Sequence, residues 1–207
     1  MGGSAVSDPG RQIAQRDRGM PESRVIDNPI SGERIVIRQS AEETGGRLLV
    51  FDLFLPPGGH VPAGHVHPVQ EERFTVVAGQ MRFRLGRRTI LAASGETVTV
   101  PAGSAHWFGN DGSVVSHARV EVRPALRTEE FLRANEAMAR TGRLLGTRLP
   151  RLSDLALVLR EFRREVAVPT VAGPVIEVLL RPAAWLARVR GRAAIVAAHR
   201  PEGGDLG

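Results

Sequence analysis

The sequence predicts an all-β sandwich or barrel followed by a helical extension, and three observations support this fold class. Between about Glu33 and Pro124, short apolar runs recur roughly every 8–15 residues, and Gly or Pro separates them. Many of these runs alternate apolar and polar residues, as a strand with one buried face does, and no helical pattern lies between them. After Pro124 the apolar residues recur at helical intervals instead.

Seven runs in the first part have the character of strands. In order they are RIVIRQ (34–39), RLLVFDLFL (47–55), RFTVVAG (73–79), QMRFRLG (80–86), RTILAAS (88–94), ETVTVPAG (96–103) and SVVSHARVEVR (113–123). Three glycines, Gly79, Gly95 and Gly103, lie where tight turns between the runs need a positive φ.

The helical part begins at Thr128, which we predict to be an N-cap, and its first helix ends at Gly146. A second helix is expected over residues 152–166 with Ser153 as its cap. Further helix is expected over residues 174–191, broken near Pro182 and Gly191, and over 193–200.

The chain therefore divides into four parts. We expect residues 1–22 to be a flexible tail, 23–124 the β-barrel domain, 125–200 the helical extension and 201–207 a second flexible tail. The N-terminal part lacks the apolar core of a secretory signal, and no apolar run is long enough to span a membrane. We therefore expect a cytoplasmic protein.

The composition excludes several chemistries. All 28 basic residues are Arg, and the chain has no Lys, Cys or Tyr. Schiff-base lysines, thiolate nucleophiles, cysteine zinc sites and tyrosyl acids are therefore excluded, and only His, Asp, Glu, Ser, Thr or a bound cofactor remain for reactive chemistry.

The basic excess lies in the helical part, because residues 123–200 carry a net charge of +8 and residues 1–122 are neutral. Packing of these helices against the barrel or a second subunit is the interpretation we favour, and it leads us to expect a homodimer. A second interpretation is that these helices contact a membrane surface through Arg, Trp and Leu. Nucleic-acid binding is not expected, because no helix-turn-helix pattern or aromatic interleaving is evident.

The segment GHVHPVQEERF holds the first candidate site residues. His65 and His67 are two residues apart, so on a strand both imidazoles project from one face. Glu72 opens the next run and shares a face with Phe74, whereas Glu71 points the other way. An ionised carboxylate on an interior face is costly unless positive charge meets it. A divalent metal held between these residues would provide that charge.

A second segment, GETVTVPAGSAHWFGN, supplies a fourth candidate ligand. After a strand-like TVTV and a turn at PAG, His106 and Phe108 alternate onto a common face. His106 together with the first three residues would surround an ion with three nitrogens and one oxygen.

Both segments resemble the two signature motifs of the cupin superfamily, with every signature position filled. These positions are Gly59, His65, His67, Glu72 and Gly79 in the first segment, and Gly95, Pro101, Gly103, His106 and Asn110 in the second. Fifteen residues separate the motifs, a short spacing similar to that of small bacterial cupins. The resemblance covers about residues 33–124 and implies a β-jelly-roll barrel with a metal in its mouth.

The resemblance also implies a ligand set: His65, His67, Glu72 and His106 would hold one divalent transition-metal ion and leave two positions open. Three histidines and a glutamate suit Fe, Mn, Ni, Cu and Zn nearly equally, so the metal is not identified. Glu72 is also a candidate catalytic base.

Five residues are candidates for a substrate pocket. Phe74, Met81 and Phe108 would give it an apolar lining suited to a small aromatic or hydrophobic molecule, or they belong to the ordinary barrel core. His60 is placed at the rim, and His117 lies on a strand whose pocket-facing side the pattern does not identify.

Two functions remain open. The first is a metal-dependent cupin enzyme, such as a mononuclear oxygenase, that acts on a small organic substrate in the barrel. The second is a non-catalytic module that binds or senses a small ligand, since one fold hosts many activities.

Overall fold

The protein is described by a computed structural model that covers residues 21, 24–61, 63–141, 151–169, 178 and 180–197. Within these ranges, nine strands form two antiparallel sheets. The strands are β1 (Val25–Asp27), β2 (Arg34–Gln39), β3 (Leu49–Leu55), β4 (Glu71–Ala78), β5 (Gln80–Leu85), β6 (Arg88–Ala93), β7 (Thr97–Val100), β8 (His106–Gly109) and β9 (Ser116–Arg123). The larger sheet has the order β1-β2-β3-β9-β4-β7, and the smaller one the order β6-β5-β8.

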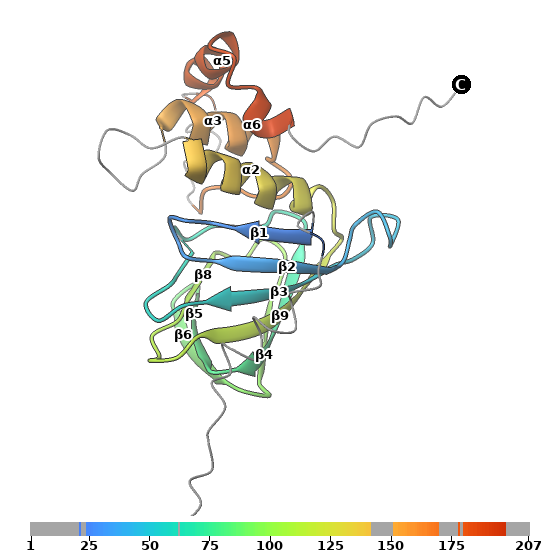
Figure 1. Cartoon of the computed structure of the whole chain (residues 1–207), viewed down its shortest axis with the longest axis vertical. Coiled ribbons are helices and arrows are strands. Elements are labelled where there is room, and N and C mark those ends of the chain that lie inside the picture. The colour runs from blue at the N-terminus through green and yellow to red at the C-terminus, as the bar shows by residue number, and fades with distance from the viewer. Residues whose placement is uncertain are drawn as a thin grey trace, which may run out of the picture.

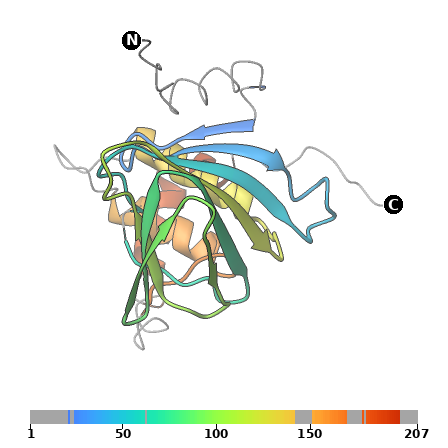
Figure 2. The same ribbon diagram turned by 90° about the horizontal axis from the view of Figure 1, so that it is seen from below.

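The two sheets enclose one apolar core, because each contributes the alternate, inward-facing residues of its strands. On β4 the buried residues are Glu72, Phe74 and Val76, and the residues between them face outward. The ring of Phe74 contacts that of Phe83 from the other sheet at 5.2 Å between centroids. Seen from below, the strands curve around this interior with the helices behind them (Figure 2). The fold is a jelly-roll β-barrel with a C-terminal helical extension, as the sequence predicts.

All seven predicted strand runs contain a strand of the structure, and the three predicted turn glycines have positive φ. Gly79, Gly95 and Gly103 have φ of 73°, 90° and 75°. At Gly79 a Cβ would also lie 3.1 Å from the main chain of Ser116, so close approach adds to the need for glycine. β1 is three residues long, too short to show a period, and was not predicted; in β8 the sequence predicted only that His106 and Phe108 share a face.

Four helices follow the barrel within the described residues: α2 (Thr128–Thr141), α3 (Leu152–Glu161), α5 (Arg181–Val189) and α6 (Ala194–Ala197). They gather at one end of the molecule, with α2 beside β1 and α3 and α5 beyond it (Figure 1). A second apolar core joins α2, α3 and α6, formed by Ala134, Met138, Val158, Phe162, Val166 and Ile195. No helix of the described part is long and apolar enough to cross a membrane.

The predicted cap of the second helix is wrong. The helix begins at Leu152 with Arg151 as its N-cap, because the Arg151 carbonyl already accepts the first helical bonds, from Asp154 and Leu155. Ser153 therefore lies inside the first turn. The predicted helix end at Gly146, most of the 174–180 segment and both predicted tails lie largely outside the described residues.

The start of the helical extension is tied to the barrel by the buried amide of Gln70. Its Nε2 lies 2.7 Å from Thr128 Oγ1 and 2.8 Å from the Pro124 carbonyl oxygen. Further along α2, the Glu136 carboxylate accepts a bond from the Asp27 N–H at the edge strand β1. Helix α2 thus packs against the barrel, as the favoured interpretation of the extension expects.

Candidate metal centre

The four predicted ligands converge on one point inside the barrel. His65, His67, Glu72 and His106 each present a ligand atom, and these atoms all lie within 4.8 Å of one another. The imidazole centroids of His65 and His106 are 4.3 Å apart, and those of His67 and His106 are 5.3 Å apart. The structure therefore brings together the complete set of residues that the two sequence motifs indicated.

Main-chain pairing explains how the two motifs meet. His65 and His106 form an antiparallel bridge, in which each main-chain N–H donates to the carbonyl of the other at 2.9 Å. The Gly103 N–H donates to the His67 carbonyl at 2.8 Å, which links the turn of the second motif to the first. Glu72 is at the start of β4, opposite Val100 of β7, so its side chain reaches the cluster from the larger sheet. Each ligand is therefore held by a hydrogen-bonded part of the main chain.

Each of the three histidines has its Nδ1 at a main-chain carbonyl oxygen. His65 Nδ1 lies 3.2 Å from the Ala63 oxygen and His106 Nδ1 lies 3.2 Å from the Ser104 oxygen. His67 Nδ1 contacts the Glu165 oxygen. Because a carbonyl can only accept, each Nδ1 carries a proton, and Nε2 is the ring atom that is directed at the cluster.

The resulting arrangement contains acceptors that face one another. Nε2 of His67 and of His106 lie 3.2 and 3.0 Å from Glu72 Oε2, but the three buried atoms lack a hydrogen bond. Lone pairs held this close in a buried site repel unless a cation lies among them. Metal-bound histidines characteristically use the same arrangement, with the second nitrogen donating to a carbonyl. The four residues therefore fit a metal ion.

The charges of the cluster are coupled. Burial alone would raise the pKa of the Glu72 carboxyl, but His67 and His106 outweigh burial and hold that pKa well below its usual range. Burial lowers the pKa of His67, yet the Glu72 carboxylate raises it overall. Burial, together with the neighbouring His106 and His67, lowers the pKa of His65 to about 3. His65 is thus a neutral ligand at physiological pH, and Glu72 is an anionic one.

The remaining site candidates lie at different depths. Phe74 and Met81 are completely buried in the barrel core, and Phe108 links that core to the cluster, 5.1 Å from the Phe74 ring and 6.5 Å from the His65 ring. His60 is exposed and lies 5.7 Å from the Trp107 ring. Phe108 is thus the candidate whose ring contacts a histidine of the cluster.

The structure does not bring His117 to the cluster. On β9 its neighbours Ala118 and Val120 face the core, so His117 lies on the opposite, outer face, where its ring stacks on Phe54 at 4.4 Å. Its Nε2 lies 3.4 Å from Asp52 Oδ1.

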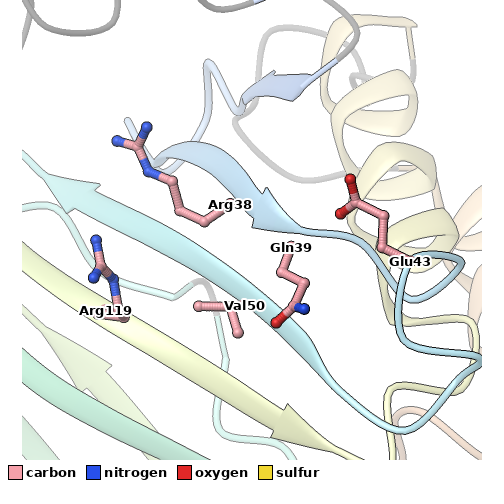
Figure 3. A pocket seen from close by; sticks show the side chains of 5 residues that line it. All are labelled: Arg38, Gln39, Glu43, Val50 and Arg119. Atoms are coloured by element: carbon pink, nitrogen blue, oxygen red, sulfur yellow. The ribbon is translucent and has the colours of Figure 1, made fainter.

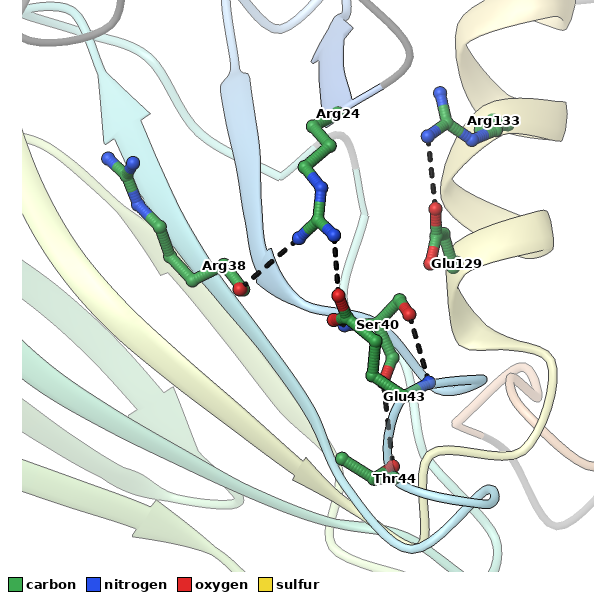
Figure 4. Close-up of polar contacts among 7 residues, drawn as sticks. All are labelled: Arg24, Arg38, Ser40, Glu43, Thr44, Glu129 and Arg133. Atoms are coloured by element: carbon green, nitrogen blue, oxygen red, sulfur yellow. Dashed lines mark hydrogen bonds and ion pairs between the residues drawn. The ribbon is translucent and has the colours of Figure 1, made fainter. Parts of the chain in front are cut away.

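A shallow groove of about 460 Å³ lies on the same outer face of the sheet. Its lining residues are Arg38, Gln39, Glu43, Val50 and Arg119 (Figure 3). At one end Arg24 donates to the Arg38 carbonyl and pairs with Glu43 (Figure 4). The four ligands are not among the lining residues, so the groove is separate from the metal centre.

Sequence reasoning missed the groups that orient the ligands. The carbonyls of Ala63, Ser104 and Glu165 give no signal in a sequence, because every residue has one. Gln70, between the first two histidines and Glu72, was not singled out either, although its buried amide fixes the end of the barrel to α2.

A jelly-roll barrel with three histidines and a glutamate at its centre is a candidate metal-binding barrel, and the comparisons support the barrel fold. Residues 52–119 match the family described as "Cupin domain". This match covers about a third of the chain, and over these residues the barrel resembles the cupin superfamily. No curated protein sequence matches it.

Several solved structures resemble the barrel. TT1209 from Thermus thermophilus is 26% identical, with a TM-score of 0.37 over 38% of this chain and 74% of that one. A protein from Thermotoga maritima described as a "predicted oxalate decarboxylase" is 20% identical. The match covers 48% of this chain and 90% of that chain, with a TM-score of 0.44. The polyketide cyclase RemF from Streptomyces resistomycificus is 22% identical. The match covers 45% of this chain and 65% of that chain, with a TM-score of 0.40.

Proposed function

We propose that this chain is a mononuclear metal-dependent cupin enzyme, an oxygenase that acts on a small organic substrate. His65, His67, Glu72 and His106 would hold one divalent transition-metal ion. The observation that carries the proposal is the orientation of the three imidazoles. Each has its Nδ1 at a carbonyl, so three Nε2 atoms and one carboxylate converge on one point.

The surroundings of the cluster support a substrate approach from the side of His65. His65 is the one ligand that is only partly buried, whereas the other three are buried. Phe108 lies beside it and offers an apolar wall. A substrate with two neighbouring oxygens and an apolar ring would fit this combination, because the oxygens reach the open metal positions and the ring packs on Phe108.

A bound ion of this kind supplies Lewis acidity and, if it is redox-active, electrons for dioxygen. The protein's own residues would bind and orient the substrate and exchange protons with it. Glu72 is ionised, since its pKa is held low, so it can accept a proton from a substrate hydroxyl. The packed core of Phe74 and Met81 behind the cluster keeps water from reaching it through the barrel.

Metal binding is tested first, by elemental analysis of protein purified without added metal and by titration of the metal-free protein with Fe(II), Mn(II), Ni(II), Cu(II) and Zn(II). We expect one ion per chain, and we expect His65→Ala to reduce the bound metal strongly. Equal metal content in the wild type and this variant would refute the assigned site.

Catalysis is tested with the Fe(II)-loaded protein and a panel of flavonoids, diketones and aromatic acids, by following oxygen consumption. We expect uptake with at least one chelating substrate and none with the Glu72→Gln variant. Tight binding of a panel member without turnover would instead support the alternative, a non-catalytic small-ligand binding or sensing module. The homodimer and the choice of metal stay predictions.

A further inference from the structure

The segment that follows α3 lies against the loop that carries two of the ligands. Val66, between His65 and His67, forms an antiparallel bridge with Ala167 of the helical extension. The Val66 N–H donates to the Ala167 carbonyl at 3.0 Å, and the Ala167 N–H donates to the Val66 carbonyl at 2.8 Å. A part of the extension is therefore paired with the ligand loop itself.

The same segment determines the orientation of His67. Its Nδ1–H donates to the main-chain carbonyl of Glu165, which is 98 residues further along the chain. The corresponding carbonyls for His65 and His106, those of Ala63 and Ser104, are only two residues away from their histidines. His65 and His106 are thus oriented by their own loops, whereas His67 depends on the extension.

The Glu165 carbonyl is itself held firmly. Glu165 is buried, its N–H donates to the Phe162 carbonyl at 3.0 Å, and its carboxylate accepts a bond from the Arg127 N–H at 3.3 Å. Phe162 is completely buried, and the Arg127 guanidinium lies 4.9 Å above its ring. The apolar core shared by α2, α3 and α6 therefore fixes the position of a single carbonyl oxygen at the metal centre.

We infer that the C-terminal helical extension is a positioning element of the metal centre: through the Glu165 carbonyl and the Val66–Ala167 bridge it holds His67 with its Nε2 toward the metal. This inference rests on the metal binding proposed above. Because binding is a linked equilibrium, the coupling is reciprocal: docking of the extension raises metal affinity, and metal binding tightens the docking.

The test uses Ala167→Pro in the full-length chain. Proline has no N–H, so the bond to the Val66 carbonyl is lost, and it also restricts the preceding Val166. We expect the Zn(II) dissociation constant, measured by competition with a chelating dye, to rise by about 10–100-fold, the usual effect of losing a partner behind a metal ligand. In the NMR spectrum of the metal-free protein, we expect the His67 Nδ1–H signal to exchange slowly in the wild type and to be lost in the variant.

The matched control is Asp154→Asn. Asp154 is completely buried in α3 and pairs with Arg192, so the substitution removes one ion pair inside the extension and leaves the apolar core and the bridge in place. We expect it to keep both the His67 Nδ1–H signal and the Zn(II) affinity of the wild type. An equal loss of affinity in both variants would show that the extension acts only through overall stability, and it would overturn the inference.

A measurement on the wild-type chain tests the same inference even if the Ala167→Pro variant does not fold. We expect Zn(II) to slow the hydrogen exchange of the Ala167 amide, since that amide is part of the coupled bridge. Unchanged exchange at Ala167 while Zn(II) binds would overturn the positioning role and leave the proposed metal site intact. Absence of Zn(II) binding by the wild type would refute the proposed site as well.

Discussion

Two buried carboxylates on opposite faces of the larger sheet have opposite surroundings. Asp52 on β3 is 2% exposed and Glu72 on β4 is 6% exposed, so both are removed from water. Arg38 Nε lies 2.7 Å from Asp52 and Arg119 Nε lies 3.0 Å from it, so two permanent cations donate to this carboxylate. Glu72 faces only imidazoles, whose Nδ1 protons are directed away to main-chain carbonyls.

The difference separates a structural ion pair from a binding site. Burial would raise the pKa of Asp52, but His117, Arg119 and Arg38 together hold it well below its usual range. The protein thus compensates Asp52 completely with its own residues. Near Glu72, the charge is compensated only by groups that can lose their protons, which leaves room for a cation from solution.

The largest expected effect distinguishes the two histidine environments. His106→Ala removes a ligand whose side chain is fully buried, and we expect it to weaken Zn(II) binding by more than about 100-fold, beyond the loss of an outer-shell partner. His117→Ala removes the histidine beside Asp52, and we expect it to leave Zn(II) affinity unchanged. Isothermal titration of both variants makes the comparison, and similar losses would contradict it.

Removal of the charge at Asp52 affects stability instead of metal binding. Asp52→Asn leaves the donors of Arg38 and Arg119 without their anionic acceptor, and we expect the free energy of unfolding to fall by about 1–3 kcal/mol. For a chain of this size, each 1 kcal/mol corresponds to roughly 2–4 °C in the unfolding midpoint. Urea denaturation gives the loss, and Zn(II) affinity measured on the same sample should match that of the wild type. A variant as stable as the wild type would mean that the arginines do not depend on Asp52.

At the candidate metal centre, the corresponding substitution Glu72→Gln should lower Zn(II) affinity and leave the stability nearly unchanged. Glu72→Gln removes a buried charge that only titratable imidazoles compensate, so we expect the metal-free protein to change in stability by less than about 1 kcal/mol. We expect its Zn(II) affinity to fall by at least about tenfold. A large loss of stability without metal would show that Glu72, like Asp52, belongs to a structural ion pair.

The sequence predicts the barrel and the ligands for the same reason: both depend on local patterns. Alternation along β4 placed Glu72 inside with Phe74 and left Glu71 outside, and the exposed Glu71 confirms it. The resemblance of the two segments to the cupin motifs then implied which histidines meet. These features are readable because each depends on residues close together in the chain.

The parts that escaped prediction depend on contacts across long stretches of chain. The Glu165 carbonyl reaches His67 from 98 residues away, and a carbonyl has no residue-specific signature. His117 was left unassigned, although β9 alternates polar residues with the buried Ala118 and Val120, and its pairing with β3 places His117 on the outer face that carries Asp52. The early start of α3 escaped for a simpler reason: Arg151 caps it through its main chain, and Ser153 made a side-chain cap the obvious expectation.

The smallest expected effect is a pH dependence that only the metal centre shows. In the metal-free protein, burial lowers the pKa of His67 but Glu72 raises it overall, so the charged pair stabilises the fold fully below the unfolded value of about 6.5. That contribution is lost as the pH rises through the folded pKa, so we expect the urea midpoint to fall as the pH rises above about 6.5. Asp52 contributes nothing to this slope, because its lowered pKa makes its contribution constant above about pH 4.

Two comparisons check this assignment. Asp52→Asn should keep the slope, and Glu72→Gln should flatten it, because the group that raises the pKa of His67 is gone. With Zn(II) present the wild-type trend should reverse, since the ion binds only the neutral imidazole and competes with its proton. A midpoint independent of pH in the metal-free wild type would mean that His67 and Glu72 are not coupled, and the contrast between the two carboxylates would then rest on geometry alone.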